Sequence, residues 1–400
     1  MNFKTMLMSA ALMTGTMQIH AQDSNAASVV VEKPRADFSS GRLTPESLWS
    51  MGRIGNVSST TDGKVITYAV TYYDIKSNKG NSVIYVKDLQ TDKTHAIFNG
   101  GNSPVFIKNG KEIAFLSSRN GSSQVWSVGI DGKNARQISH AQKDVEGFLF
   151  SPDEKKVILI HSIDNNTVIE KKENDLPLAT GMVINDLMYK HWDQYNTSSP
   201  HPFIADFDGA SNISEGTDML EGEPLEYATS TDSDIFLYDL SNKITKNLCK
   251  PSNYAAPSVI YTKTLQDQSV NKTETDCNVG YDQNPQFSPN GRYIAWTSME
   301  RDGYESDRTR LCVYDFKTGT KSYVTEVFES GVNEFGWDAD NNHIFFSGVW
   351  HGQTQLYRTD LKGHVKQLTN DTCDYSLVQV ISSKLLLAKR QSMQRADEVY

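Results

Sequence analysis

The stretch Phe287–Trp296, with the sequence FSPNGRYIAW, decides the fold of this chain. An apolar residue ends one strand, Asn290-Gly291 supplies the positive φ that a tight hairpin needs, and an apolar run begins the next strand. The same pattern recurs at Thr60–Tyr68, Phe106–Phe115 and Phe150–Leu159, with a weaker copy at Trp337–Phe346. Repeated hairpins of this kind predict antiparallel sheet.

The spacing of these hairpins predicts the architecture. Their turn residues follow one another at intervals of 47, 44, 137 and 50 residues; the long interval equals about three repeats. Most hairpins are followed by a third strand-like run and a short fourth one, as at Ser82–Leu89, Gln124–Val128, Asp234–Leu240, Arg310–Asp315 and Gln355–Asp360. Because this period is that of a four-stranded blade, residues 51–400 are expected to form an all-β propeller of about six to seven blades.

Composition excludes several classes of protein. The 400 residues are 38% hydrophobic and 22% charged, which fits a globular chain rather than a collagen or a coiled coil. The formal net charge of −10 argues against nucleic acid and anionic membrane as main partners, because binding them requires a concentrated basic face. The repeat has the length of a WD40-like repeat, but no Gly-His pair is followed by a Trp-Asp pair as that class requires.

The N-terminus is typical of an exported protein. Residues 1–21 contain Lys4, an apolar run over Met6–Met13, and the small residue Ala21 at the expected cleavage point. The run is too short to span a bilayer, so we expect a cleaved signal peptide, no membrane span and a periplasmic or secreted product. Residues 22–50 form a lead-in, in which Thr44-Pro45-Glu46 predicts the start of a short helix.

Two segments interrupt the repeat. Residues 161–223 depart from strand periodicity and include Asp186–Tyr195, whose apolar residues have helical spacing, so we interpret them as an excursion from a blade. Residues 249–277 are polar and form an expected inserted loop. Cys249 and Cys277 bound this loop and either form a disulfide or remain independent thiols. No Cys-x-x-Cys and no Cys/His pair has metal-ligand spacing, so no metal or cofactor is predicted.

Candidate site residues gather in and after the excursion. They are His191, Trp192, Asp193, Glu221 and Glu223. Carboxylates beside an aromatic ring suit the capture of a cationic amine. The alternative is a solvated turn with a half-buried tryptophan. Gly-x-Ser-x-Gly and His-Glu-x-x-His are both absent, so no catalytic residue is assigned in this chain and its status as an enzyme stays open.

Several segments together carry a family resemblance. They are Leu43–Glu46, Phe150–Asp153, Asp186–Asp193, His201–Asp206, Leu220–Pro224, Ser233–Leu240 and Phe287–Gly291. On these the chain resembles the propeller half of prolyl oligopeptidase-family serine peptidases, and most nearly their dipeptidyl peptidase 5 type. The resemblance implies a C-terminal α/β-hydrolase domain whose Ser, Asp and His lie beyond Tyr400. This sequence is therefore expected to be a fragment that ends within an incomplete blade, at the start of its third strand over Ala396–Tyr400.

One blade departs from the family pattern. Glu223–Ala228 runs almost directly into Ser233-Asp234, where family members carry an inner hairpin, so this blade is expected to be degenerate. The segment between Cys249 and Cys277 is extra relative to the family and contains a strand-like run only at Ser258–Thr262.

The resemblance also implies a function. The propeller would cap the active site of an exported exopeptidase, exclude folded substrates and hold the N-terminus of a peptide, a role transferred to His191, Trp192, Asp193, Glu221 and Glu223. Its partners would be peptide substrates and the hydrolase domain. The alternative is a TolB-like periplasmic propeller that binds proteins and performs no chemistry.

Overall fold

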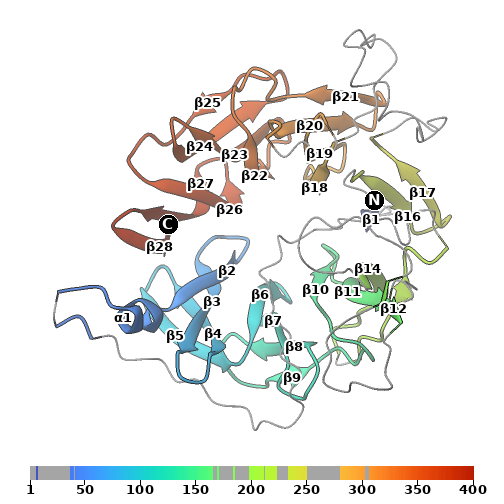
Figure 1. The fold of residues 1–400 in the computed structure, drawn as a ribbon. Coiled ribbons are helices and arrows are strands. Elements are labelled where there is room, and N and C mark those ends of the chain that lie inside the picture. Colours follow the sequence, from blue (N-terminus) through green and yellow to red (C-terminus); the bar gives the residue numbers. More distant parts are fainter. Residues whose placement is uncertain are drawn as a thin grey trace.

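The computed structural model describes residues 6–7, 37–39, 41–164, 169–170, 183–184, 198–210, 212–222, 233–249, 280–301 and 306–400. The one helix in this part of the chain is α1, Pro45–Ser50, and all its other regular elements are strands. The strands form antiparallel sheets that stand around a common axis (Figure 1). The predicted all-β propeller is therefore confirmed.

Five of the described blades contain four strands each, paired in chain order from the innermost to the outermost. They are β2 (Arg53–Ser59), β3 (Val65–Asp74), β4 (Lys79–Asp88) and β5 (Lys93–Asn99); β6 (Asn102–Ile107), β7 (Glu112–Ser117), β8 (Gln124–Gly129) and β9 (Arg136–Gln137); β10 (Gly147–Phe150), β11 (Lys156–Asp164), β14 (Ser198–Asp206) and β15 (Thr217–Asp218); β18 (Asp282–Phe287), β19 (Tyr293–Ser298), β20 (Arg310–Asp315) and β21 (Thr320–Tyr323); β22 (Val332–Trp337), β23 (His343–Trp350), β24 (Gln353–Asp360) and β25 (Lys366–Gln367). A further blade has three strands, β26 (Asp374–Ser382), β27 (Leu385–Ser392) and β28 (Arg395–Val399), which confirms the incomplete last blade.

A hydroxyl and an Asn or Asp side chain hold the inner hairpin turns. Ser288 Oγ donates to Asn290 Oδ1 at 2.8 Å and accepts from the Tyr293 N–H at 3.0 Å. Gly291 then adopts φ +69°, a conformation that costs glycine little. The same bonds recur with Thr60 and Asp62 at 2.7 Å and with Ser151 and Asp153 at 2.7 Å. Local chemistry thus explains why the sequence pattern of these turns repeats.

The blades pack against one another through apolar faces. Between the first two blades, the buried cluster contains Ile84, Phe98, Phe115 and Trp126, and the Phe98 and Phe115 ring centroids lie 4.4 Å apart. Cys312 is fully buried in β20, as its strand pattern predicted. Because each sheet buries both faces against its neighbours, the radial arrangement supplies the core.

A second device repeats at the outer strands of the blades. The backbone N–H of a residue in the first half of the third strand donates to a hydroxyl just after the fourth strand, as from Val125 to Ser139 Oγ (2.8 Å) and from Leu311 to Thr325 Oγ1 (2.8 Å). Leu356 donates to Thr369 Oγ1 at 2.9 Å in the same way. This bond satisfies an amide at the point where the ladder to the short fourth strand has ended.

The degenerate blade contains the strands β16 (Phe236–Asp239) and β17 (Ile244–Asn247). These correspond to third and fourth strands, and β1 (Met6–Leu7) pairs with the other edge of β16. The predicted loss of the inner hairpin from this blade falls on residues outside the described part of the chain and stays a prediction. Residues 223–232 and 250–279, which flank the two strands, lie outside the described part of the chain.

The excursion is shorter than the sequence pattern predicted. The ladder between β11 and β14 continues to Asp164 opposite Ser198, so the predicted boundaries 161 and 223 both fall in or beside a complete blade. Polar residues explain the error, because the directly opposed His161 and His201 are fully buried and break the apolar pattern of their strands. Between Asp164 and Ser198 the structure describes one short antiparallel pair, β12 (Ile169–Glu170) with β13 (Val183–Ile184).

The predicted lead-in helix is confirmed. Thr44 caps α1 by accepting from the Ser47 N–H, while Ser47 Oγ accepts from the Thr44 N–H, and Pro45 occupies the first turn. These groups satisfy amides that would otherwise lack partners at the helix start. Within the described residues, no helix combines the length and apolar character needed to cross a membrane.

Side chains close the ring between the first and last blades. Among the residues that the structure describes, the two sheets share no strand, since β2 pairs only with β3 and β26 pairs only with β27. Instead Gln379 Oε1 accepts from the N–H and from the hydroxyl of Ser59, both at 3.1 Å. Figure 1 shows β2 and β26 facing one another across this seam.

Candidate functional site

The described candidate residues lie at one end of the propeller, which we call the linking end. At this end the fourth strand of each blade finishes and the first strand of the next blade begins. Because the strands are antiparallel, the turn between the second and third strands of each blade lies at the same end. Gln124, at the start of β8, shows this proximity, because its Nε2 donates to the carbonyls of Ala141 and Lys143 in the link to the next blade. The excursion between β11 and β14 also leaves from this end.

Glu221 lies at the linking end, three residues after the end of β15. Its side chain is exposed, and the turn that carries it is held by Asp218, whose Oδ1 accepts from the Leu220 N–H at 2.9 Å. Asp218 Oδ2 in turn lies 2.8 Å from Nδ1 of the buried His201. A fixed, exposed carboxylate of this kind is suited to binding an ammonium group.

The other predicted members of the site cannot be placed beside Glu221. His191, Trp192, Asp193 and Glu223 lie outside the described residues. The amine-binding role of the five residues therefore stays a prediction.

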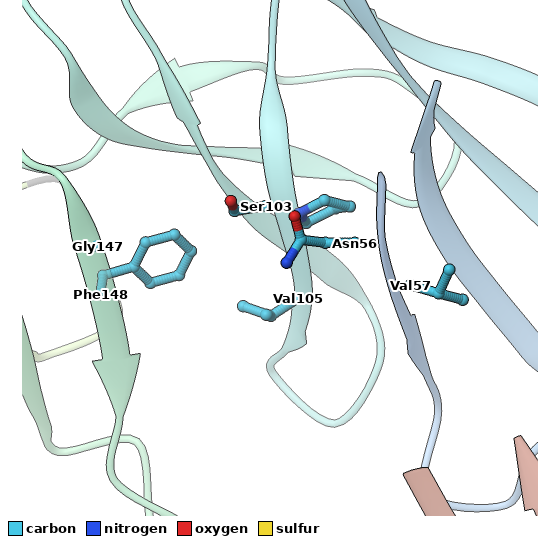
Figure 2. Close-up of a pocket in the computed structure, with 7 residues that line it drawn as sticks. Asn56, Val57, Ser103, Val105, Gly147 and Phe148 are labelled. Atoms are coloured by element: carbon cyan, nitrogen blue, oxygen red, sulfur yellow. The ribbon is translucent and has the colours of Figure 1, made fainter. Parts of the chain in front are cut away.

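A small cavity of about 110 Å³ opens among the innermost strands of the first three blades (Figure 2). Asn56, Val57, Ser103, Val105 and Phe148 are among its lining residues. The first strands of two of these blades are irregular there, with register shifts between Ile54 and Val57 and between Asn102 and Val105. No lining residue is ionisable, so this cavity can hold small neutral groups but offers no acid or base to activate the Ser103 hydroxyl.

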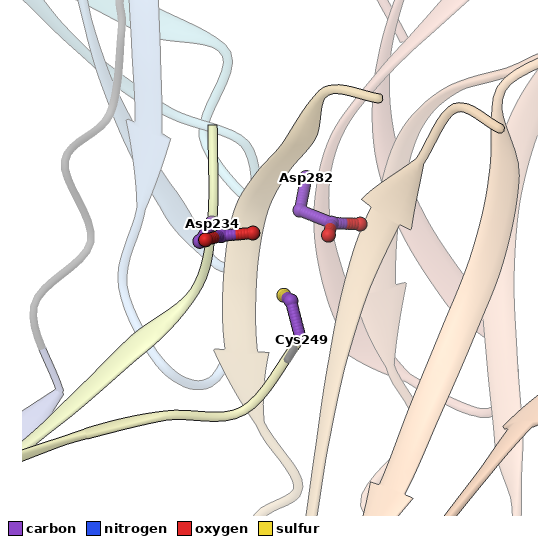
Figure 3. Close-up of side chains that lie close together, drawn as sticks. All are labelled: Asp234, Cys249 and Asp282. Atoms are coloured by element: carbon purple, nitrogen blue, oxygen red, sulfur yellow. The ribbon is translucent and has the colours of Figure 1, made fainter. Parts of the chain in front are cut away.

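Three side chains that sequence analysis did not group come together at the linking end. They are Asp234, Cys249 and Asp282, whose potential ligand atoms all lie within 4.8 Å of one another (Figure 3). Asp282 and Cys249 are buried at 2% and 1% exposure. Burial, and after it the carboxylate of Asp282, raises the pKa of the Cys249 thiol, so the thiol is protonated at neutral pH. The acids lie 15 and 33 residues from the cysteine, which is why no short motif revealed the group.

A second group of Asp338, Asp340 and His343 has a simpler explanation. All three belong to one hairpin turn, where Asp340 Oδ1 accepts from the N–H groups of Asn342 and His343. Ser383 Oγ donates to Asp338 Oδ1 at 2.7 Å. The bond from the Asn342 N–H matches those at Asp62, Asp153 and Asn290 in the other inner turns, so Asp340 serves the hairpin.

The predicted disulfide also involves Cys249. This residue is a free thiol in the structure, and Cys277 lies outside the described residues. Pairing of the two cysteines therefore stays a prediction, and Cys312 and Cys373 are free thiols as well.

Comparison with known proteins shows similarity to peptidases. The chain is 33% identical over 405 aligned residues to dipeptidyl-peptidase 5 of Porphyromonas gingivalis, an alignment that covers 92% of this chain and 55% of that protein. Hence the chain spans about half the length of the curated relatives that it matches. No family model matches the sequence.

Solved structures agree on the fold. Acylaminoacyl peptidase of Pyrococcus horikoshii superposes with a TM-score of 0.60 at 13% identity, over 88% of this chain and 51% of that one. The β-propeller domain of the Trilobed protease from Pyrococcus furiosus, described as having an open velcro topology, superposes with a TM-score of 0.53 at 14% identity, over 87% of this chain and 92% of that one. At such identities the likeness shows the propeller fold alone.

Proposed function

We propose that this chain, a homologue of the dipeptidyl-peptidase 5 proteins of the prolyl oligopeptidase family, is the propeller portion of an exported serine exopeptidase. In this proposal it gates access to the active site and anchors the N-terminus of the peptide. Hydrolysis requires an α/β-hydrolase domain that supplies Ser, Asp and His. The observation that carries the proposal is the match of 92% of this chain to 55% of a dipeptidyl-peptidase 5 at 33% identity.

The linking end supports an anchoring role. Glu221 is exposed there, on a turn fixed by Asp218, and the excursion leaves the ring at the same end. An exopeptidase that removes two residues must hold the free amine at a set distance from its nucleophile, and a carboxylate on a rigid turn provides such a reference point. The ring of blades would admit extended peptides to the active site and exclude folded proteins.

The first experiment asks whether the hydrolase domain exists. The gene is sequenced beyond codon 400, and the full protein and the 400-residue chain are assayed with dipeptidyl chromogenic substrates. The proposal expects an in-frame Gly-x-Ser-x-Gly, activity of the full protein that a serine-directed reagent abolishes, and no activity of the 400-residue chain. A stop codon at position 401 would instead favour the TolB-like binding module. Activity of the 400-residue chain itself would refute the assignment of roles.

The second experiment tests the anchor in the full protein. Glu221→Gln is expected to lower kcat/KM for substrates with a free N-terminus by about 10- to 100-fold, which corresponds to the roughly 1.5–3 kcal/mol of a charge-assisted hydrogen bond. Glu146→Gln removes another exposed carboxylate, next to the start of β10 at the linking end, and is the matched control. Equal losses in the two variants, or an equal effect on N-blocked substrates, would rule out amine recognition by Glu221.

Export is tested separately. If residues 1–21 are a signal peptide, the protein recovered from the periplasm or the medium begins at Gln22. An intact Met1 in the recovered protein would contradict the proposal.

A further inference from the structure

Asp234, Cys249 and Asp282 reach one point from two neighbouring blades. Asp234 precedes β16 and Cys249 follows β17, so both belong to the degenerate blade, whereas Asp282 begins β18 of the next blade. Figure 3 shows the three side chains close together, with the Cys249 sulfur between Asp234 and Asp282. Two hard oxygen donors and one soft sulfur donor form a mixed ligand set of the kind that zinc accepts.

Comparison with the other blades shows that the fold does not require these residue types. Cys249 takes the position of Ser139, Thr325 and Thr369, since its Sγ accepts the Ile235 N–H at 3.2 Å just as those hydroxyls accept the equivalent amide. A hydroxyl is the better acceptor for this bond, because sulfur accepts hydrogen bonds only weakly. Asp234 takes the position of the uncharged Gln124 and Gln355. The degenerate blade therefore places a thiol where the three sister blades use a hydroxyl, and a carboxylate where they use Gln124, Arg310 and Gln355.

Each of the three side chains is also oriented by a donor outside the group. Trp296 Nε1 donates to Asp282 Oδ1 at 2.9 Å, and Asn247 Nδ2 donates to Asp234 Oδ2 at 2.7 Å. The Ile235 N–H donates to the sulfur. Metal ligands are commonly fixed in this manner, because a donor on one atom of a side chain directs the other atom toward the ion.

We propose that Asp234, Cys249 and Asp282 bind a zinc ion that cross-links the degenerate blade to the blade that follows it. Ligand atoms around a tetrahedral zinc ion lie roughly 3.5 Å apart, as follows from bonds of about 2.0–2.3 Å. Atoms that already lie within 4.8 Å of one another reach that arrangement through small side-chain movements. On binding, the Cys249 thiol gives up its proton to solvent and the thiolate becomes the third protein ligand, with water in the fourth position.

The location gives the zinc ion a structural purpose. Within the described residues after Ala21, the degenerate blade has only the β16–β17 ladder, because β1 lies within the proposed signal peptide. Its described links to the next blade include the Ser233–Tyr281 bridge, the Asp282 N–H to Ser233 carbonyl bond of 2.8 Å and the Lys321 Nζ to Cys249 carbonyl bond of 2.9 Å. A buried cluster that contains Ile235, Leu248, Ile294 and Trp296 also spans the two blades. A metal ion shared by the two blades would stabilise the native state by its full free energy of binding, because the unfolded chain offers no such preformed group.

The experiment uses the 400-residue chain, purified with a non-chelating reductant and stripped of metal. The proposal expects one zinc ion per chain by mass spectrometry, a higher Tm with zinc than with EDTA, and a thiolate-to-metal charge-transfer band on titration with cobalt. Cys249→Ser retains an acceptor for the Ile235 N–H and removes the soft ligand, so it should fold, lose the cobalt band and bind zinc at least about 100-fold more weakly. Asp282→Asn should also weaken binding. Asn247→Ala, which removes an orienting donor, should weaken binding by about 10- to 100-fold.

Two control variants make the outcome decisive. Cys373→Ser removes another thiol and Asp340→Asn removes a carboxylate from the hairpin group, and both should bind zinc as the parent does. A parent chain that shows neither the cobalt band nor a zinc-dependent Tm overturns the proposal. So does a Cys249→Ser variant with unchanged zinc affinity.

Discussion

At the scale of single residues, the inner hairpins depend on a hydroxyl bonded to an Asp or Asn side chain. The bond from the Thr60 hydroxyl, followed by those from Lys64, lowers the pKa of Asp62 to about 2, and the Ser151 hydroxyl likewise lowers the pKa of Asp153. A carboxylate with a depressed pKa stabilises the fold above its unfolded pKa of about 3.9 and loses that effect as the pH falls through the folded value. Asn290 occupies the same position without a titrating group.

This difference predicts a pH effect at one turn. Asp62→Asn keeps the Oδ1 acceptor but removes the charge, so the Tm advantage of the parent over the variant should be constant above pH 4 and shrink between pH 4 and pH 2. Thermal unfolding of both proteins from pH 6 to pH 2 measures this difference in Tm. Asn290→Asp is the reciprocal control and should introduce the same dependence. An advantage that stays constant down to pH 2 would contradict the role of the charge.

The bond at the outer strands predicts a second effect. Thr325 is buried, and its hydroxyl accepts the Leu311 N–H at 2.8 Å. Thr325→Val keeps the shape but leaves this amide without an acceptor, at a cost of about 1–3 kcal/mol in the free energy of unfolding. Thr325→Ser keeps the acceptor and loses about 0.8 kcal/mol for the missing methyl group. Denaturant unfolding of the two variants tests the assignment, and a valine variant as stable as the serine variant would disprove it.

At the scale of elements, the sequence was informative wherever local chemistry repeats. The inner hairpins and the α1 cap could both be predicted, because each depends on residues within one short stretch. The excursion boundary was wrong, since burial of His161 and His201 depends on the packing of a whole blade. No pattern in one strand could have revealed the Asp234–Cys249–Asp282 group, whose members meet only when two blades are assembled.

At the scale of the whole molecule, ring closure depends on few contacts. Within the described part of the chain, the first and last sheets share no strand, and Gln379 bonds Ser59 across the seam. Gly63 lies at the same seam, where an added Cβ would come within 2.9 Å of the Ile381 side chain. Side-chain contacts therefore close the ring, whereas backbone hydrogen bonds between strands hold each blade together.

The seam gives a prediction for stability. Gln379→Ala leaves the half-buried Ser59 amide without its acceptor and is expected to cost about 1–3 kcal/mol. Hydrogen exchange should accelerate first in β2 and β26, because local opening begins where the fewest contacts hold two units together. Gln391→Ala removes an exposed glutamine from the same blade and is the control. Uniform acceleration over all blades would argue against a weak seam.

A propeller whose first and last sheets share no strand can gain or lose a blade at the seam between these two sheets. A duplicated blade could be inserted next to β26, or a whole blade removed there, and the strands that remain would keep their hydrogen-bonded neighbours. The bonds between Ser59 and Gln379 and the contact of Gly63 with Ile381 would then be re-formed with new neighbours. A change in the number of blades is therefore far easier at this position than in a propeller whose first and last blades share a strand.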